Sequence, residues 1–146
     1  MSSHDLQSEN LPLSGTRVLD ITVVWAGPYC TSFLADMGAE VIRVESTARL
    51  PPPPTRGATA HPSEDIAKSS GLPGGVPGAR PWNRVPLFNA HARNKLSMTV
   101  DLLKPDGMDI FKRLAKISDV FVENNPSETM NKLGISYDML REQNPE

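Results

Sequence analysis

The stretch from Arg17 to Glu45 constrains the fold of this chain more than any other, because it predicts a strand, a turn, a helix and a second strand in succession. Residues 17–22 are mostly apolar and β-branched, as a strand requires. Trp25–Gly27 form the turn, a helix is expected to start with Pro28 at its first position, and residues 40–45 form the next strand. Two strands joined by one helix over so short a stretch predict a right-handed βαβ unit with parallel strands.

The helix of this unit carries an apolar stripe. Its members recur every four residues, with two neighbours beside them: Tyr29, Phe33 and Met37, with Cys30 and Leu34. A single apolar face predicts that the stripe packs in the core, with Cys30 as a small buried side chain rather than a nucleophile. Ligands of parallel sheets bind beyond the carboxyl ends of the strands, so residues 24–27 are expected to lie at a binding site.

Composition divides the chain into four segments. Residues 1–10 are expected to be a loose leader, and residues 11–45 hold the first βαβ unit. Residues 46–86 contain nine of the fourteen prolines and five of the ten glycines, which predicts a long loop, part polyproline II and part disordered. Residues 87–146 are predicted to add a second βαβ unit and short helices to the same domain.

The last segment has its own regular pattern. Strands are predicted over residues 97–102 and 119–123, with a helix that opens at Pro105 between them. The apolar stripe of this helix comprises Ile110, Phe111, Leu114 and Ile117. Short helices are predicted over residues 127–133 and 136–143, the second capped by its first residue, a serine. The predicted fold class is therefore α/β, a parallel sheet with flanking helices.

The overall composition excludes several functional classes. The formal net charge is −2, so no broad basic surface points to nucleic acid. A single cysteine allows no internal disulfide and favours a reducing compartment. No apolar run approaches the roughly 20 residues of a membrane span, and the polar start lacks the plan of a signal peptide. We therefore predict a soluble cytoplasmic protein without a membrane partner.

Known nucleotide-binding motifs are absent from the sequence. The turn after the first strand reads V-W-A-G-P instead of GxGxxG, and no GxxxxGK[ST] motif occurs. The helix start at Gly27 and Pro28 would attract a phosphate through its free N–H groups, although an ordinary strand-to-helix turn is the more common outcome. No metal-ligand spacing links His4, His61 and His91, so no metal site is predicted.

Single polar residues give weak signals. Acids stand near the strand ends at Asp20, Glu45, Asp101 and Glu123, where an acid more often caps a loop or pairs with a neighbour than catalyses. His91 is expected in a loop, exposed at the surface rather than acting in acid–base chemistry. Arg93, Lys95 and Lys104 either hold phosphates or line a solvated loop, and Lys132 is weighed in the same way.

Six ordered motifs carry far more information together than any residue alone. They are L-x-G-x-R-V-L-D-x-T (13–22), A-G-P-Y-C (26–30), L-A-D-M-G-A-E-V-I-R-V-E (34–45), R-N-K-x-S (93–97), D-V-F-V-E-N (119–124) and L-R-E-Q-N-P (140–145). In this order they resemble the N-terminal part of class III coenzyme A transferases, the CaiB/BaiF group, which includes formyl-CoA transferase and α-methylacyl-CoA racemase. Ser46, Leu96 and Asn125 depart from the residues usual in that family.

The resemblance implies a Rossmann-like domain that binds coenzyme A (CoA) as the acyl-CoA substrate, within a two-domain chain that forms an interlocked homodimer. The implied CoA contacts are Trp25, Ala26, Val100, Asp101, Leu102, Leu103, Asn124, Asn125 and Lys132. The family's transferases use an aspartate that attacks the thioester and forms covalent intermediates. That aspartate is expected beyond residue 146, so no catalytic residue is assigned within this sequence.

Three functions follow as hypotheses from this resemblance. The first is the CoA-binding portion of an enzyme that transfers CoA between an acyl-CoA and a carboxylic acid, expected to be inactive without the nucleophile. The second is a racemase-type member of the same family. The third is a non-catalytic module that binds CoA or another nucleotide.

Overall fold

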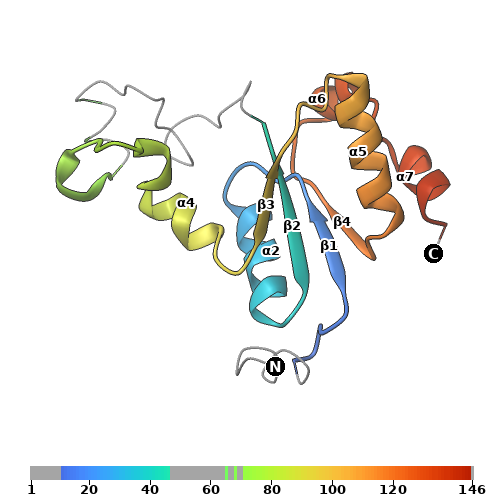
Figure 1. Cartoon of the computed structure of the whole chain (residues 1–146), viewed down its shortest axis with the longest axis horizontal. Coiled ribbons are helices and arrows are strands. Elements are labelled where there is room, and N and C mark those ends of the chain that lie inside the picture. Colours follow the sequence, from blue (N-terminus) through green and yellow to red (C-terminus); the bar gives the residue numbers. More distant parts are fainter. Residues whose placement is uncertain (1–10, 47–64, 66–67, 69–70, 146) are drawn as a thin grey trace.

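The computed structural model describes residues 11–46, 65, 68 and 71–145. Within them, four strands form one parallel sheet in the order β3-β2-β1-β4 (Figure 1). The strands are β1 (Arg17–Asp20), β2 (Glu40–Glu45), β3 (Leu96–Thr99) and β4 (Val120–Val122). Helices flank the sheet, so the predicted α/β class with a parallel sheet is confirmed.

Alternation along β1 builds the two sides of the core. Leu19 and Ile21 face α5 (Pro105–Lys116) and pack with Phe111 and Ala115. Val18 points to the other side, where it packs with Val41 of β2 and with Ala35 of α2 (Ala26–Asp36). Residues one apart in a strand face opposite sides, so a strand buried on both faces supports a helix layer on each.

The second strand–helix–strand unit has a different topology from the first. β3 and β4 are parallel, as predicted, but β2 and β1 lie between them, so the two strands are not neighbours. The chain leaves β3 at one side of the sheet, runs through α5 and returns as β4 at the other side (Figure 1). A sequence pattern predicts a crossover connection but does not count the strands that it crosses.

The helices near the end of the chain agree with the sequence. α6 (Ser127–Leu133) ends at Gly134, whose φ of 67° is a left-handed cap. α7 (Tyr137–Gln143) follows, and the Met139 amide donates a 3.2 Å hydrogen bond to Ser136 Oγ, the expected N-cap. Both predicted helices are therefore confirmed.

The described part of the proline-rich segment contains ordered structure. Two single-turn 3₁₀ helices, η1 (Pro73–Gly75) and η2 (Pro81–Asn83), precede α4 (Pro86–His91). Leu72 and Val85 are buried in a small cluster with side chains of α4. The expected disorder does not apply to residues 71–85, where these two apolar residues provide a local core, but the backbone of Leu72 (φ −59°, ψ 138°) does lie in the polyproline II region. The predicted leader, 1–10, and most of residues 47–70 lie outside the described residues.

The predicted packing of α2 is wrong for four of the five stripe residues, whereas Leu34 packs against the core as predicted. Tyr29, Phe33 and Met37 are 49%, 45% and 44% exposed, and Cys30 is also exposed. The buried face instead contains small and hydroxyl-bearing residues, namely Gly27, Pro28, Thr31, Ser32 and Ala35. The physical reason is Asp20 at the end of β1: a buried carboxylate must be hydrogen-bonded, and Thr31 Oγ1 supplies a 2.6 Å bond to it.

A substitution on the exposed stripe tests this correction. Replacing Phe33 with glutamine is expected to lower the free energy of unfolding by about 1 kcal/mol or less, because only its edge contact with Tyr29 and its place beneath Arg93 are lost. Urea unfolding monitored by circular dichroism measures the change. A loss of about 3 kcal/mol or more, the cost of emptying an aromatic core position, would show that the stripe is buried after all.

Among the described residues, no helix combines the length and the apolar composition that crossing a membrane requires.

Candidate functional site

Parallel strands end at one edge of the sheet, and three of the segments proposed to bind a ligand follow these ends. Trp25 and Ala26 come after β1, residues 100–103 after β3, and Asn124 and Asn125 after β4. Residues 100–103 cross toward α6 at the top of the sheet in Figure 1, and Val100 and Leu102 pack in the same apolar cluster as Met130 and Leu133 of that helix. We call these three segments together with Lys132 of α6 the carboxyl-edge rim.

The two asparagines join β4 to the turn after β1. Asn124 Oδ1 accepts a 2.9 Å hydrogen bond from the Val23 amide, and its Nδ2 donates at 2.7 Å to the Val24 carbonyl. Asn125 Nδ2 donates at 3.0 Å to the Ile21 carbonyl. Side-chain amides that satisfy loop backbone groups hold that loop in one conformation. Both asparagines therefore shape the turn in front of Trp25, whatever further contacts they make with a ligand.

The turn itself has unusual backbone geometry. Trp25 has a φ of 47°, and its side chain is 57% exposed. A positive φ is unfavourable for a bulky residue and persists only where the surroundings enforce it. Gly27 lies two residues after Trp25 and has no room for a side chain. A Cβ at this position would stand 2.6 Å from Thr22 Cβ and 2.8 Å from Asn124 Cγ. The backbone approaches the end of β4 only because residue 27 is glycine.

The segment after β3 is a tight turn fixed by an acid. Asp101 Oδ1 accepts a 3.1 Å hydrogen bond from the Leu103 amide, which identifies Asp101 as a loop-capping residue. The side chain of Leu103 is 68% exposed and that of Lys132 on α6 is exposed. The rim therefore presents an apolar side chain, an aromatic side chain and one lysine to solvent, features that suit a ligand with both apolar and anionic parts.

A buried polar cluster of Asp20, Thr31 and Lys95 lies where β1 meets the start of α2. Lys95 Nζ donates to Asp20 Oδ2 at 3.1 Å, to the Pro28 carbonyl at 2.8 Å and to Thr31 Oγ1 at 2.6 Å. The Lys95 and Asp20 side chains are only 1% and 0% exposed. Asp20 also accepts hydrogen bonds from the Thr22 amide and hydroxyl. Asp20 thus pairs with a neighbour, as predicted, while neither predicted role for Lys95, phosphate binding or a solvated loop, matches its burial.

Burial affects the titration of this cluster. Desolvation lowers the pKa of the Lys95 ammonium, and the charge and hydrogen bond of Asp20 oppose that effect.

A second ion pair on the same face of the sheet joins Arg43 and Glu45, whose side chains are 6% and 9% exposed. We did not predict this ion pair from the sequence, although a basic and an acidic residue two positions apart in one strand point to the same face of the sheet.

His91 is the other site residue that the sequence misplaced. It ends α4, is only 8% exposed, and makes edge contacts with Trp25 (5.8 Å between ring centroids) and Tyr29 (5.6 Å). Burial lowers its pKa below the usual 6.5, and the charges of Lys95, Arg93 and Arg43 lower it further. The prediction of an exposed loop histidine is wrong, because the proline-initiated helix α4 places it against Trp25, just before α2, and Tyr29 of α2.

The depressed pKa of His91 predicts a pH dependence of stability. Below pH 6.5 the unfolded chain binds the proton first, so the free energy of unfolding decreases as pH falls from 6.5 through the folded-state pKa. Urea unfolding of the wild type and of His91→Gln at pH 7.5 and pH 5 measures the difference. The variant is expected to lose less stability than the wild type over this range. Equal slopes would contradict a buried, neutral histidine.

The charged residues around α2 do not all belong to the rim. Arg93 Nη2 pairs with Asp36 Oδ2 at 2.6 Å near the last turn of α2, and Asn94 donates to the other oxygen of that carboxylate. Arg93 holds the pKa of Asp36 below its usual value. Lys104 precedes α5 as its N-cap and is exposed. The structure thus does not gather Arg93, Lys95 and Lys104 into one phosphate-binding group.

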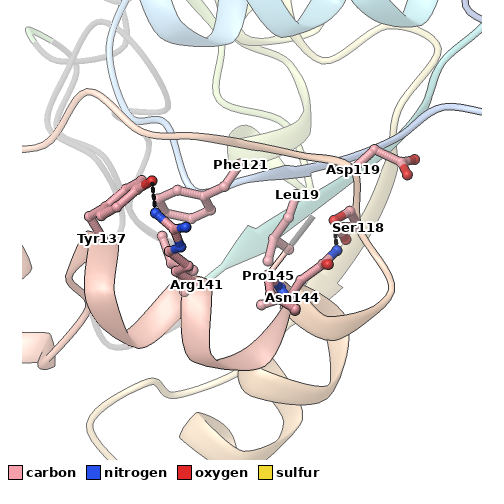
Figure 2. A pocket seen from close by; sticks show the side chains of 10 residues that line it. Leu19, Ser118, Asp119, Phe121, Tyr137, Arg141, Asn144 and Pro145 are labelled. Carbon is pink, nitrogen blue, oxygen red and sulfur yellow. Dashed lines mark hydrogen bonds between the residues drawn. The ribbon is translucent and has the colours of Figure 1, made fainter.

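A pocket of about 450 Å³ lies away from the rim, between β4, α5 and α7 (Figure 2). Figure 2 labels eight of its lining residues: Leu19, Ser118, Asp119, Phe121, Tyr137, Arg141, Asn144 and Pro145. Asn144 Nδ2 donates to the Ser118 carbonyl at 3.0 Å, just before β4 begins. None of the nine residues proposed for CoA, all of which the structure describes, lines this pocket.

Comparison with known proteins places these features in a family. The sequence profile of CoA-transferase family III matches residues 13–146. The chain is 38% identical to an acyl-CoA transferase of Fusarium pseudograminearum, over 91% of this chain and 26% of that protein. It is 34% identical to the succinyl-CoA–L-malate CoA-transferase alpha subunit of Chloroflexus aurantiacus, over 99% of this chain and 29% of that protein.

Solved structures show the same relationship. A CaiB/BaiF family protein from Brucella suis superimposes with a TM-score of 0.69 at 29% identity, over 92% of this chain and 31% of that chain. The chain thus spans about a third of the length of the proteins that it matches.

Proposed function

Because the chain belongs to CoA-transferase family III, we propose that its carboxyl-edge rim binds the CoA part of an acyl-CoA, within an enzyme that transfers CoA between an acyl-CoA and a carboxylic acid. The observation that carries this proposal is the convergence of the ends of β1 and β4, which the Asn124 amide joins through Val23 and Val24. A ligand at this edge meets backbone and side chains from several strands at once.

The rim suits the parts of CoA. The exposed indole of Trp25 and the exposed Leu103 offer apolar contact for the pantetheine arm, and Lys132 offers a cation for a phosphate. The two relatives described above are named as an acyl-CoA transferase and a CoA-transferase subunit, which favours transfer over racemisation for the whole enzyme. Assembly into an interlocked homodimer and a cytoplasmic location belong to this proposal as further expectations.

Isothermal titration of the chain with CoA tests the proposal. CoA is expected to bind, and Lys132→Ala is expected to weaken binding about tenfold, because a charge-assisted contact with phosphate is lost. Lys116→Ala is the matched control: Lys116 is also an exposed lysine in the last turn of a helix, but it lies at the opposite end of α5 from the rim. This control should bind as the wild type does.

Titration with pantetheine separates the two halves of the ligand. Pantetheine lacks the nucleotide phosphates, so its affinity should not depend on Lys132, whereas Trp25→Ala should weaken both ligands. A chain that binds neither CoA nor pantetheine, or one in which Lys116→Ala and Lys132→Ala weaken CoA equally, would contradict a site at the carboxyl-edge rim.

A further inference from the structure

We propose that Lys95 is a positioning residue of the rim, whose buried ammonium fixes the conformation of the Trp25 turn; this inference rests on the proposed function for its link to CoA binding. Lys95 belongs to the connection between α4 and β3, far from Trp25 in the sequence. Its role therefore depends on the contacts that the folded chain makes around the ammonium.

The ammonium joins three elements at one point. It donates to Asp20 at the end of β1 and to Pro28 and Thr31 in the first turns of α2. Residues 21–25, which include Trp25, form the whole connection between β1 and α2. Fixing both ends of a five-residue connection leaves it few conformations, so the ammonium restricts the turn without touching the indole.

The positive φ of Trp25 shows that the turn needs such restriction. A φ of 47° is unfavourable for a tryptophan and is maintained only when the surroundings determine it. Asn124 holds the turn from the side of β4 through Val23 and Val24, and Lys95 holds it from the side of β3. Lys95 thus fixes the two sides of the turn, and Asn124 fixes its middle.

Direct contact between Lys95 and a phosphate is excluded by its surroundings. An ammonium has three N–H groups, and here all three are donated to protein acceptors. The side chain is 1% exposed. Loss of Lys95 therefore acts through the turn and not through a lost ligand contact.

The chain provides a matched control in the Arg93–Asp36 ion pair. This pair also connects α2 to the segment before β3, at 2.6 Å, but it lies at the last turn of α2 and is partly exposed. Breaking it removes a link between α2 and the segment before β3 while leaving the first turn of α2 and the Lys95–Asp20 pair untouched. Asp36→Asn therefore reports the general effect of loosening α2.

Hydrogen–deuterium exchange of the free full chain tests the inference, with Lys95→Met compared with Asp36→Asn. Exchange of the amides in residues 22–27 is expected to accelerate about tenfold or more in Lys95→Met and to match the wild type in Asp36→Asn. CoA affinity, measured by calorimetry, should fall about tenfold or more in Lys95→Met only. Equal exchange of residues 22–27 in the two variants would overturn the inference.

Two further variants keep the inference testable if Lys95→Met does not fold. If Lys95→Met does not fold, Thr31→Val removes one acceptor and keeps the ion pair, and it should accelerate the same amides by a smaller factor. Asp20→Asn combined with Lys95→Met removes both charges and should restore folding but not the slow exchange. Exchange decides the role of Lys95 in the absence of ligand, whereas a wild type that binds no CoA contradicts the proposed function alone.

Discussion

Replacing Phe111 with alanine is expected to lower the free energy of unfolding by about 3–5 kcal/mol, enough to leave the chain largely unfolded if its stability is ordinary. Phe111 is 0% exposed on α5 and packs with Leu19 of β1 and with Ile21, which directly follows β1. Its ring also meets that of Phe121 on β4 edge to face, at 5.9 Å between centroids. The variant loses the transfer energy of the ring and leaves a cavity between helix and sheet.

Ile117→Ala is the control on the same element. Ile117 follows the last turn of α5 and is 55% exposed, although the sequence places it in the same apolar stripe as Phe111. Its removal should cost about 1 kcal/mol or less. Urea unfolding monitored by circular dichroism compares the two variants with the wild type. Similar losses in both would contradict the packing of α5 against β1 and β4.

Gly107→Ala is expected to destabilise the chain by about 1–3 kcal/mol, the opposite sign to the usual effect of this substitution within a helix. Alanine normally stabilises a helix relative to glycine by about 1 kcal/mol. At Gly107 an added Cβ would stand 2.0 Å from the Asp101 carbonyl oxygen and 3.1 Å from Val100 Cγ2. Backbone cannot yield as a flexible side chain does, so either α5 or residues 100–103 must move.

The same substitution should weaken CoA binding, because residues 100–103 form one segment of the carboxyl-edge rim. Calorimetric titration and urea unfolding of Gly107→Ala measure both effects. Asp109→Ala, at an exposed position two residues further along α5, should change stability by about 0.5 kcal/mol at most and leave the affinity unaltered. A Gly107→Ala protein more stable than the wild type would show that α5 does not approach Asp101 closely.

Local patterns in the sequence predicted most of the regular structure. Strands, α5, α6 and α7 follow from periodicity and capping residues, as Ser136 and Gly134 illustrate. The parallel direction follows from the helix between β1 and β2. These features depend on neighbours within a few residues, which a sequence displays directly.

The errors arise where a distant partner decides the outcome. The exposed face of α2 cannot be inferred from its apolar spacing, because Asp20 and Lys95 draw Thr31 inward from outside the helix. His91 is buried for a similar reason, since Trp25 and Tyr29 come from another element. For the rim, the end of the first strand predicted the place of residues 24–27, and the family resemblance supplied the other segments. Asp101 caps a loop as expected, but the sequence did not predict that the Asn124 side chain shapes the turn after β1.

The strand order has a consequence for how the length of the chain can vary. β3 is an edge strand of the sheet and pairs with β2 from Ile42–Leu96 to Glu45–Thr99. This strand pairing therefore closes the whole connection between β2 and β3. The entropic cost of closing a loop rises only with the logarithm of the loop length, so doubling that length costs about 0.6 kcal/mol. A change in the length of this connection therefore costs little, whereas one residue added within β1 would turn the side chains beyond it to the opposite face of the sheet.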